Sequence, residues 1–304
     1  MFPAFKAIGS SFGYFISQAP TIIKILWAPA ALMMAAQLYF TPKMVEAQLA
    51  MIDLEAEGAD PSLILTQFSD MLPSIGALYL VMAIAFPMMI AGLLRSIVRG
   101  ETPSLPFYLR YGGDELRVLV AFILLIILVM IIYLVGAVAV FAITAVSSLA
   151  GGTIAGVLSG VAMLVFFGGM VWFLVRMSLV YAAGVDGKTL GIAQSWAMTK
   201  GSFFGLFFFW IVIMVVMALF LLLFVGVSMP GYFADMYQLI QAADDPGAAA
   251  EIEKRMIDAQ IALYDLSKPV GWLYAAATYV MTIVSTAIWV AASGIAYRYL
   301  KEAA

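Results

Sequence analysis

The stretch that decides the fold runs from Val157 to Lys200: VLSGVAMLVFFGGMVWFLVRMSLVYAAGVDGKTLGIAQSWAMTK. Its first part is an apolar run, closed by Arg176, that exceeds the roughly 17 residues needed to cross a bilayer. A short polar loop then leads to an amphipathic segment that carries Trp196 and Lys200. The chain returns at once as a second apolar run, GSFFGLFFFWIVIMVVMALFLLLF. This order of span, basic connecting segment and returning span is typical of a polytopic membrane protein.

The composition agrees with a membrane protein and excludes several chemistries. Of the 304 residues, 65% are hydrophobic and 11% are charged, whereas a soluble domain has about 45–50% apolar and about 25% charged residues. The chain has no cysteine and no histidine. Disulfides, Cys- or His-ligated metal or haem sites and Ser–His triads are therefore unavailable to it. We expect no cofactor, no metal and no nucleic-acid partner.

The alternation of apolar and polar stretches predicts an all-α membrane helix bundle, formed by residues 1–304 as a single domain. Six transmembrane helices are expected at about 22–40, 75–94, 118–146, 154–181, 203–227 and 270–297. Apolar residues at helical spacing in 2–18 predict a short helix, which either lies in the membrane interface or packs on other helices. Two acidic outer segments, 41–73 and 229–268, each contain two amphipathic helices, with breaks near Gly58 to Pro61 and at Asp244 to Gly247.

The distribution of charge predicts the orientation of these spans. The termini and the segments around 95–117 and 176–200 together hold eleven basic residues against five acids, whereas the two outer segments hold four basic residues against thirteen acids. Cytoplasmic segments of membrane proteins carry an excess of Lys and Arg. Both termini are therefore predicted to lie in the cytoplasm.

Catalytic and transport signatures are missing from the spans. None of the six spans contains an acid, although proton-coupled carriers and ion channels usually need ionisable groups in the membrane interior. No nucleophile elbow, phosphate-binding loop or zinc-protease motif occurs. Asp114 and Glu115 are the acidic pair nearest to a catalytic arrangement, and a salt-bridged turn explains them better because Arg110 and Arg117 flank them. We do not expect an enzyme.

The basic residues of the two cytoplasmic segments form the candidate lipid-headgroup site. They are Arg95, Arg99, Arg110, Arg117, Arg176, Lys188 and Lys200. A ring of such charges at the membrane surface binds anionic phospholipids, although the positive-inside rule alone is the simpler explanation of the same charges. Trp196 is interpreted as an interface anchor.

A ridge of glycines marks the fourth span. Gly152, Gly156, Gly160 and Gly168 are spaced by multiples of four residues and therefore share one face of a helix. Such a ridge lets a second helix approach closely. We interpret it as a helix-packing surface, with a solute path as the alternative.

One segment of the sequence is similar to a known family. Residues 176–210, RMSLVYAAGVDGKTLGIAQSWAMTKGSFFGLFFFW, resemble the membrane region of bacterial YciC-like proteins and the membrane domain of glycerophosphodiester phosphodiesterases. The shared features are an Arg that closes a span (Arg176), a Ser-Trp pair (Ser195 and Trp196) and a Lys-Gly pair before the next span (Lys200 and Gly201). The resemblance implies a six-span module of the bacterial inner membrane without phosphodiesterase activity.

These observations lead to two functional hypotheses. The first is a non-enzymatic inner-membrane protein that acts through protein or lipid contacts, as a scaffold or as an accessory subunit of a membrane complex. Its partners would be membrane phospholipids and either another membrane protein or further copies of itself. The alternative is a transporter or translocase of a lipid or an apolar small molecule.

Overall fold

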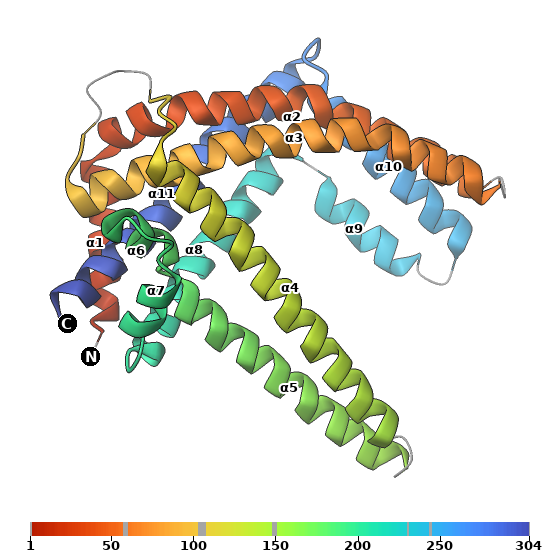
Figure 1. Ribbon diagram of the computed structural model, residues 1–304. Coiled ribbons are helices and arrows are strands. Elements are labelled where there is room, and N and C mark those ends of the chain that lie inside the picture. Colours follow the sequence, from red (N-terminus) through yellow and green to blue (C-terminus); the bar gives the residue numbers. More distant parts are fainter. Residues whose placement is uncertain are drawn as a thin grey trace.

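A computed structural model describes residues 2–56, 60–102, 108–147, 151–229, 231–242 and 245–303 (Figure 1). Every regular element in these ranges is a helix. In chain order the elements are α1 (Ala4–Ser17), α2 (Ala19–Ala56), α3 (Pro61–Leu94), the π-helical turn η1 (Arg95–Arg99), α4 (Gly113–Ser147), α5 (Gly152–Met177), α6 (Val180–Gly187), α7 (Ile192–Met198), α8 (Phe203–Ser228), α9 (Tyr232–Gln241), α10 (Pro246–Tyr264) and α11 (Pro269–Glu302).

Within the described residues, six helical segments are long and apolar enough to cross a membrane. They are Ala19–Ile52, Ser62–Arg99, Gly113–Ser147, Thr153–Gly187, Phe203–Ser228 and Pro269–Glu302. The expected fold class, an all-α bundle with six membrane spans, is therefore confirmed. The helices extend beyond the predicted spans because the polar residues that follow each apolar stretch are helical as well.

Both ends of the chain lie at the same end of the bundle (Figure 1), as an even number of crossings requires. The hydroxyl groups of Ser10 in α1 and Tyr299 in α11 are 2.9 Å apart. Phe2, just before α1, packs edge to face on Phe209 of α8, with ring centroids 5.6 Å apart. We call this end the termini end and the opposite one the far end. Which side of the membrane each end faces stays a prediction.

Helices α2 and α3 form a long antiparallel pair that runs the length of the bundle (Figure 1). The backbones approach closely at Gly92, where a Cβ atom would come within 2.7 Å of both Ile25 and Tyr108. Both helices continue through internal prolines, at positions 29 and 42 in α2 and at 73 and 87 in α3. Residues 41–56 and 61–73, predicted as part of an outer segment, are thus the far ends of two spanning helices. Gly58, where the predicted break begins, lies outside the described residues.

The second outer segment folds into α9 and α10, the two helices expected there. Asp245 caps α10, because its carboxylate accepts hydrogen bonds from the backbone N–H groups of Gly247 and Ala248 at 3.0 and 3.2 Å. Asp244, where the expected break begins, lies outside the described residues. Helix α10 lies along the far end of the α2–α3 pair (Figure 1), so the two outer regions form one helical assembly.

Helices α4 and α5 form a hairpin that diverges from the α2–α3 pair (Figure 1). Its two helices meet where the ring of Phe166 lies against Gly136, a position at which any side chain would collide with that ring. Large apolar side chains along the hairpin, such as Met130, Phe141 and Leu164, are exposed. In a bilayer these side chains contact lipid acyl chains, which are as apolar as they are.

The buried core of the protein lies near the termini end. It combines Ile22, Ile25 and Leu26 of α2, Met89, Ile90, Leu93 and Leu94 of α3, Leu206 and Phe209 of α8, and the run from Ala287 to Ala296 of α11. The short helix α6 is buried among them, with Val180 and Ala182 through Val185 among its buried residues. Most of the polar contacts between distant parts of the chain surround this helix.

Candidate functional site

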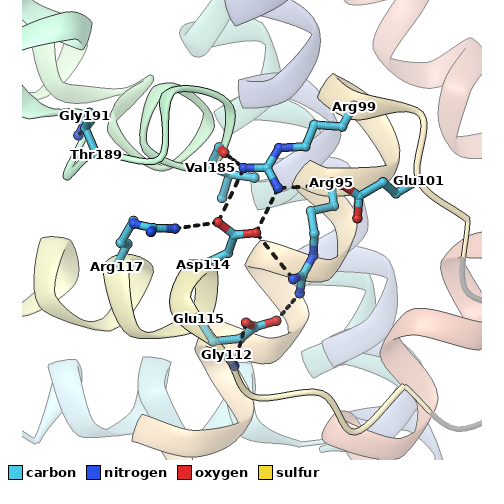
Figure 2. Close-up of polar contacts among 10 residues, drawn as sticks. All are labelled: Arg95, Arg99, Glu101, Gly112, Asp114, Glu115, Arg117, Val185, Thr189 and Gly191. Atoms are coloured by element: carbon cyan, nitrogen blue, oxygen red, sulfur yellow. Dashed lines mark hydrogen bonds and ion pairs between the residues drawn. The ribbon is translucent and has the colours of Figure 1, made fainter.

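A five-residue π-helical turn, η1, joins α3 to the segment before α4. A π-turn is wider than an α-turn and is often found at functional sites. Here it carries both Arg95 and Arg99, whose guanidinium groups point toward the first turn of α4 (Figure 2). Gly100 ends η1 with a φ of 69°, in the left-handed region that glycine adopts without strain.

The first turn of α4 supplies two carboxylates to these arginines (Figure 2). Asp114 accepts from Nη1 of Arg95 at 3.4 Å, from Nη1 of Arg99 at 2.9 Å and from Nη1 of Arg117 at 2.8 Å. Glu115 pairs with Nη2 of Arg95 and also accepts the backbone N–H of Gly112 at 2.9 Å. The positive end of the α4 dipole adds to the stabilisation of both acids.

The centre of the cluster is buried, and the charges of the cluster are balanced. Glu115 is 0% exposed and Arg95 is 2% exposed, and Glu101 pairs with Arg99 at 3.6 Å. Three arginines thus meet three acids. Arg99 also donates to the backbone carbonyl of Val185, which ties η1 to α6. The acids considered as a catalytic pair are therefore engaged by arginines, and Arg95, Arg99 and Arg117 have their charges satisfied within the chain.

Tyr108 covers one side of this cluster. Its ring centroid lies 5.5 Å from Cζ of Arg95, within the range of a cation–π contact. Burial raises the pKa of Tyr108, and the nearby positive charge of Arg95 opposes that rise. Tyr108 is therefore a neutral phenol at physiological pH. Nothing in the sequence around this tyrosine had indicated that it would cover the buried cluster.

A second polar contact joins α6 to α11. Asp186, at the end of α6, accepts a hydrogen bond from the Tyr297 hydroxyl at 2.6 Å and pairs with Lys301 at 2.5 Å. The two partners are separated from Asp186 by more than 100 residues in the chain. Helix α6 is therefore fixed on one side by Arg99 and on the other by the last helix.

Arg176 differs from the other basic residues, because it is buried without an acid. It is 7% exposed, and its Cζ lies 4.6 Å from the ring centroid of Trp196 in α7 and 5.7 Å from that of Trp172 in α5. The two indole rings meet edge to face, 5.0 Å apart. Among the described residues, its buried Nε has no hydrogen-bond partner and no carboxylate pairs with the guanidinium.

The chain breaks its helix directly after Arg176. Helix α5 ends at Met177 and α6 begins at Val180, whereas the fourth span was expected to continue to residue 181. Ser195 of α7 bridges the break: its hydroxyl donates to the carbonyl of Arg176 at 2.7 Å and accepts the N–H of Leu179 at 3.3 Å. The Arg, Ser and Trp of the family resemblance therefore meet at one place in the fold.

The remaining predicted site residues are less constrained. Arg110, Lys188 and Lys200 are exposed at the termini end. Lys188 ends α6 with a φ of 53°, in the left-handed region. Gly152 begins α5, and a Cβ atom at Gly156, Gly160 or Gly168 would meet no described atom within 4 Å. The glycine ridge is therefore free of other helices of the described chain, and its packing role stays a prediction.

An apolar groove of about 710 Å³ lies between α3, α5, α8 and α11. Its lining consists of Phe86, Val171, Leu174, Val175, Ser178, Phe207, Trp210, Ile211, Ile213, Met214, Met217, Ser285, Thr286 and Trp289. Leu174 and Met214 are exposed, so the groove opens on the surface that the bilayer covers. Its volume falls in the range of small-molecule sites. Sequence periodicity gave no signal for it, because lipid-facing and groove-facing positions are equally apolar.

Comparisons of this chain with protein-family models, with curated proteins and with solved structures found no match. The likeness to YciC-like proteins therefore stays a prediction.

Proposed function

We propose that this protein is a non-enzymatic membrane protein that holds a membrane lipid in the groove between α5 and α8 and acts through lipid and protein contacts. The observation that carries the proposal is the groove itself, with its apolar lining and its exposed border. An acyl chain fits such a surface because it needs no hydrogen bonds. The few polar groups in the lining, among them Ser178, Ser285 and Thr286, place no charge in the groove.

The proposal includes a location and partners. The likeness of residues 176–210 to YciC-like proteins supports a bacterial inner membrane, and the excess of basic residues at the termini end supports a cytoplasmic position for that end. The open glycine ridge of α5 is where we expect a second copy or another membrane protein to pack. In such an assembly the protein serves as a scaffold or accessory subunit.

The test is to fill the groove. Val171→Trp places a bulky ring in the lining, whereas Val165→Trp makes the same change on the same helix at an exposed position outside the groove. The measurement is native mass spectrometry of protein purified in mild detergent, combined with lipid extraction. Val171→Trp is expected to lose the bound lipid and Val165→Trp to retain it. Equal lipid content in both variants and the wild type contradicts the proposal.

Lipid translocation is the second candidate, and the opening of the groove toward the bilayer favours it. In liposomes with a fluorescent phospholipid, a translocase accelerates the exposure of inner-leaflet lipid to an impermeant quencher. Val171→Trp then abolishes that acceleration and Val165→Trp preserves it. If the wild-type protein does not accelerate lipid exposure relative to empty liposomes, translocation is contradicted and only the lipid-holding role remains.

A further inference from the structure

The chain buries two arginines near the termini end, and only one of them is neutralised. Arg95, 2% exposed, meets the carboxylates of Asp114 and Glu115. Arg176, 7% exposed, has aromatic rings around it and no acid among the described residues. A guanidinium does not lose its proton in proteins and has five N–H donors. Burying one without an anion is strongly unfavourable.

Among the described residues, no acid pairs with Arg176. Between Leu116 and Ala234 the sequence has a single acid, Asp186. Its carboxylate is already engaged by Tyr297 and Lys301. The carbonyl of Arg176 itself is occupied by the Ser195 hydroxyl. Within the described part of the chain, the positive charge at this position is thus not neutralised by an acid.

We infer that Arg176, which lies against the touching rings of Trp172 and Trp196, binds the phosphate of an anionic phospholipid whose acyl chain occupies the adjacent groove. This inference rests on the proposed function. A phosphate matches the planar guanidinium, because two oxygens accept two parallel N–H donors.

The position of Arg176 in the fold suits a lipid. It closes the apolar run of α5, where the headgroup region of a bilayer is expected. Its neighbours Val175 and Ser178 line the groove, so a lipid with its phosphate at Arg176 has an apolar path for its tail within one helical turn. The basic residues Lys188 and Lys200 at the same end favour a headgroup with net negative charge.

The experiment uses the full chain, stripped of lipid in mild detergent, and measures binding by native mass spectrometry. The probes are dioleoyl phosphatidylglycerol, dioleoylglycerol with the same chains and no phosphate, and inorganic phosphate. Arg176→Gln is compared with Arg298→Gln, an exposed arginine at the same end. Arg176→Gln is expected to weaken phosphatidylglycerol binding about tenfold or more, since a charge-assisted pair is lost. Arg298→Gln is expected to change it less than twofold.

The three probes separate the possible outcomes. If dioleoylglycerol binds both variants equally and only phosphatidylglycerol binding falls in Arg176→Gln, the inference holds. If Arg176→Gln binds phosphatidylglycerol as the wild type does, the inference is overturned while the groove proposal stands. If inorganic phosphate at millimolar concentration displaces phosphatidylglycerol, the ligand of Arg176 is a soluble phosphate. The inference that the phosphate belongs to a lipid is then wrong.

A second variant protects the test against misfolding. Arg176→Lys keeps the positive charge and loses the planar pair of donors. It is expected to weaken phosphatidylglycerol binding by an intermediate factor, with dioleoylglycerol binding unchanged. The assignment is overturned if Arg176→Lys binds phosphatidylglycerol with wild-type affinity and any folded Arg176→Gln protein does so as well.

Discussion

Glu115 is a charged side chain with no exposed surface, at the point where a membrane helix begins. Its burial is tolerated because Arg95 and the N–H of Gly112 satisfy both carboxylate oxygens. A buried ion pair adds little over two well-packed apolar groups, but removing one partner leaves an uncompensated charge. The pair therefore fixes the position of α4 against η1, and a substitution of either partner alone is expected to destabilise the protein.

Glu115→Leu is expected to destabilise the protein by about 3–5 kcal/mol, because Arg95 keeps only the longer contact to Asp114. The measurement is thermal unfolding in detergent. The double variant Arg95→Met, Glu115→Leu is expected to recover most of that loss. Glu302→Leu is the control, since its pairing with Arg298 at 3.8 Å is exposed and worth about 1 kcal/mol at most. A double variant as unstable as Glu115→Leu contradicts this explanation.

Two glycines with similar backbone angles differ in what surrounds them. Gly191 has a φ of 75° and Gly201 a φ of 81°. A Cβ atom at Gly191 would lie 2.0 Å from the carbonyl oxygen of Val180, whereas one at Gly201 meets nothing within 4 Å. Gly201→Ala is expected to cost about 1–2 kcal/mol from backbone strain alone. Gly191→Ala is expected to prevent accumulation of folded protein, as checked by size-exclusion chromatography of fluorescently tagged chains. Equal behaviour of the two variants contradicts the close packing of α6 against the loop before α7.

At the scale of elements, the break between α5 and α6 is the feature that organises the termini end. A broken helix leaves backbone groups without partners, and each unsatisfied buried group costs about 1–3 kcal/mol. Ser195 satisfies two of them, and Ser293 of α11 donates to the carbonyl of Ser178 at 3.0 Å. Hydroxyl groups from two other helices thus hold α6 in its turned position.

Ser195→Ala is expected to lose about 1–3 kcal/mol, since the N–H of Leu179 loses its side-chain partner and the carbonyl of Arg176 keeps only the longer contact to Thr199 at 3.4 Å. Ser285→Ala is the matched control, because the Ser285 hydroxyl bonds only within its own helix, to Thr282 at 3.3 Å. Hydrogen exchange followed by mass spectrometry should report faster exchange at residues 176–185 in Ser195→Ala alone. Unchanged exchange there shows that other contacts hold the break.

Sequence patterns predicted the number and approximate position of the spanning helices, since apolar length is a direct consequence of bilayer thickness. They did not predict α6. Apolar residues resume directly after Ser178 and continue to Val185, so hydropathy alone does not distinguish a separate helix from the end of the fourth span. The pairing of Asp114 with Arg117 was expected. The pairing with Arg95 and Arg99, in place of Arg110, was not expected, and neither was the burial, because both depend on how distant parts of the chain pack together.

At the scale of the whole molecule, the orientation in the membrane is open to a direct measurement. The chain has no cysteine, so single cysteines can be introduced without background. Lys200→Cys lies at the termini end and Ser69→Cys toward the far end, and both positions are exposed. In intact bacterial spheroplasts, an impermeant maleimide is expected to label Ser69→Cys and to label Lys200→Cys only after lysis. The reverse pattern contradicts the predicted cytoplasmic termini.

The glycine ridge of α5 gives a prediction about assembly. Gly160→Leu fills the ridge at a position where no described atom lies within 4 Å, so the fold of one copy is expected to be unaffected. If a second helix packs there, the substitution lowers the oligomeric mass measured by light scattering with detergent correction. Val165→Leu, on another face of the same helix, is the control. An unchanged mass in Gly160→Leu removes the ridge as an assembly surface.

The spacing of the ion pairs along the chain has a consequence for biogenesis. Arg95 finds its acids only 19 and 20 residues later, at Asp114 and Glu115, so this cluster can close as soon as the start of α4 has left the ribosome. Asp186 must wait for Lys301, 115 residues further on. We therefore expect insertion to divide into an early step, in which α2 to α4 assemble around a neutralised cluster, and a late step, in which α11 packs on α6 and fixes its position.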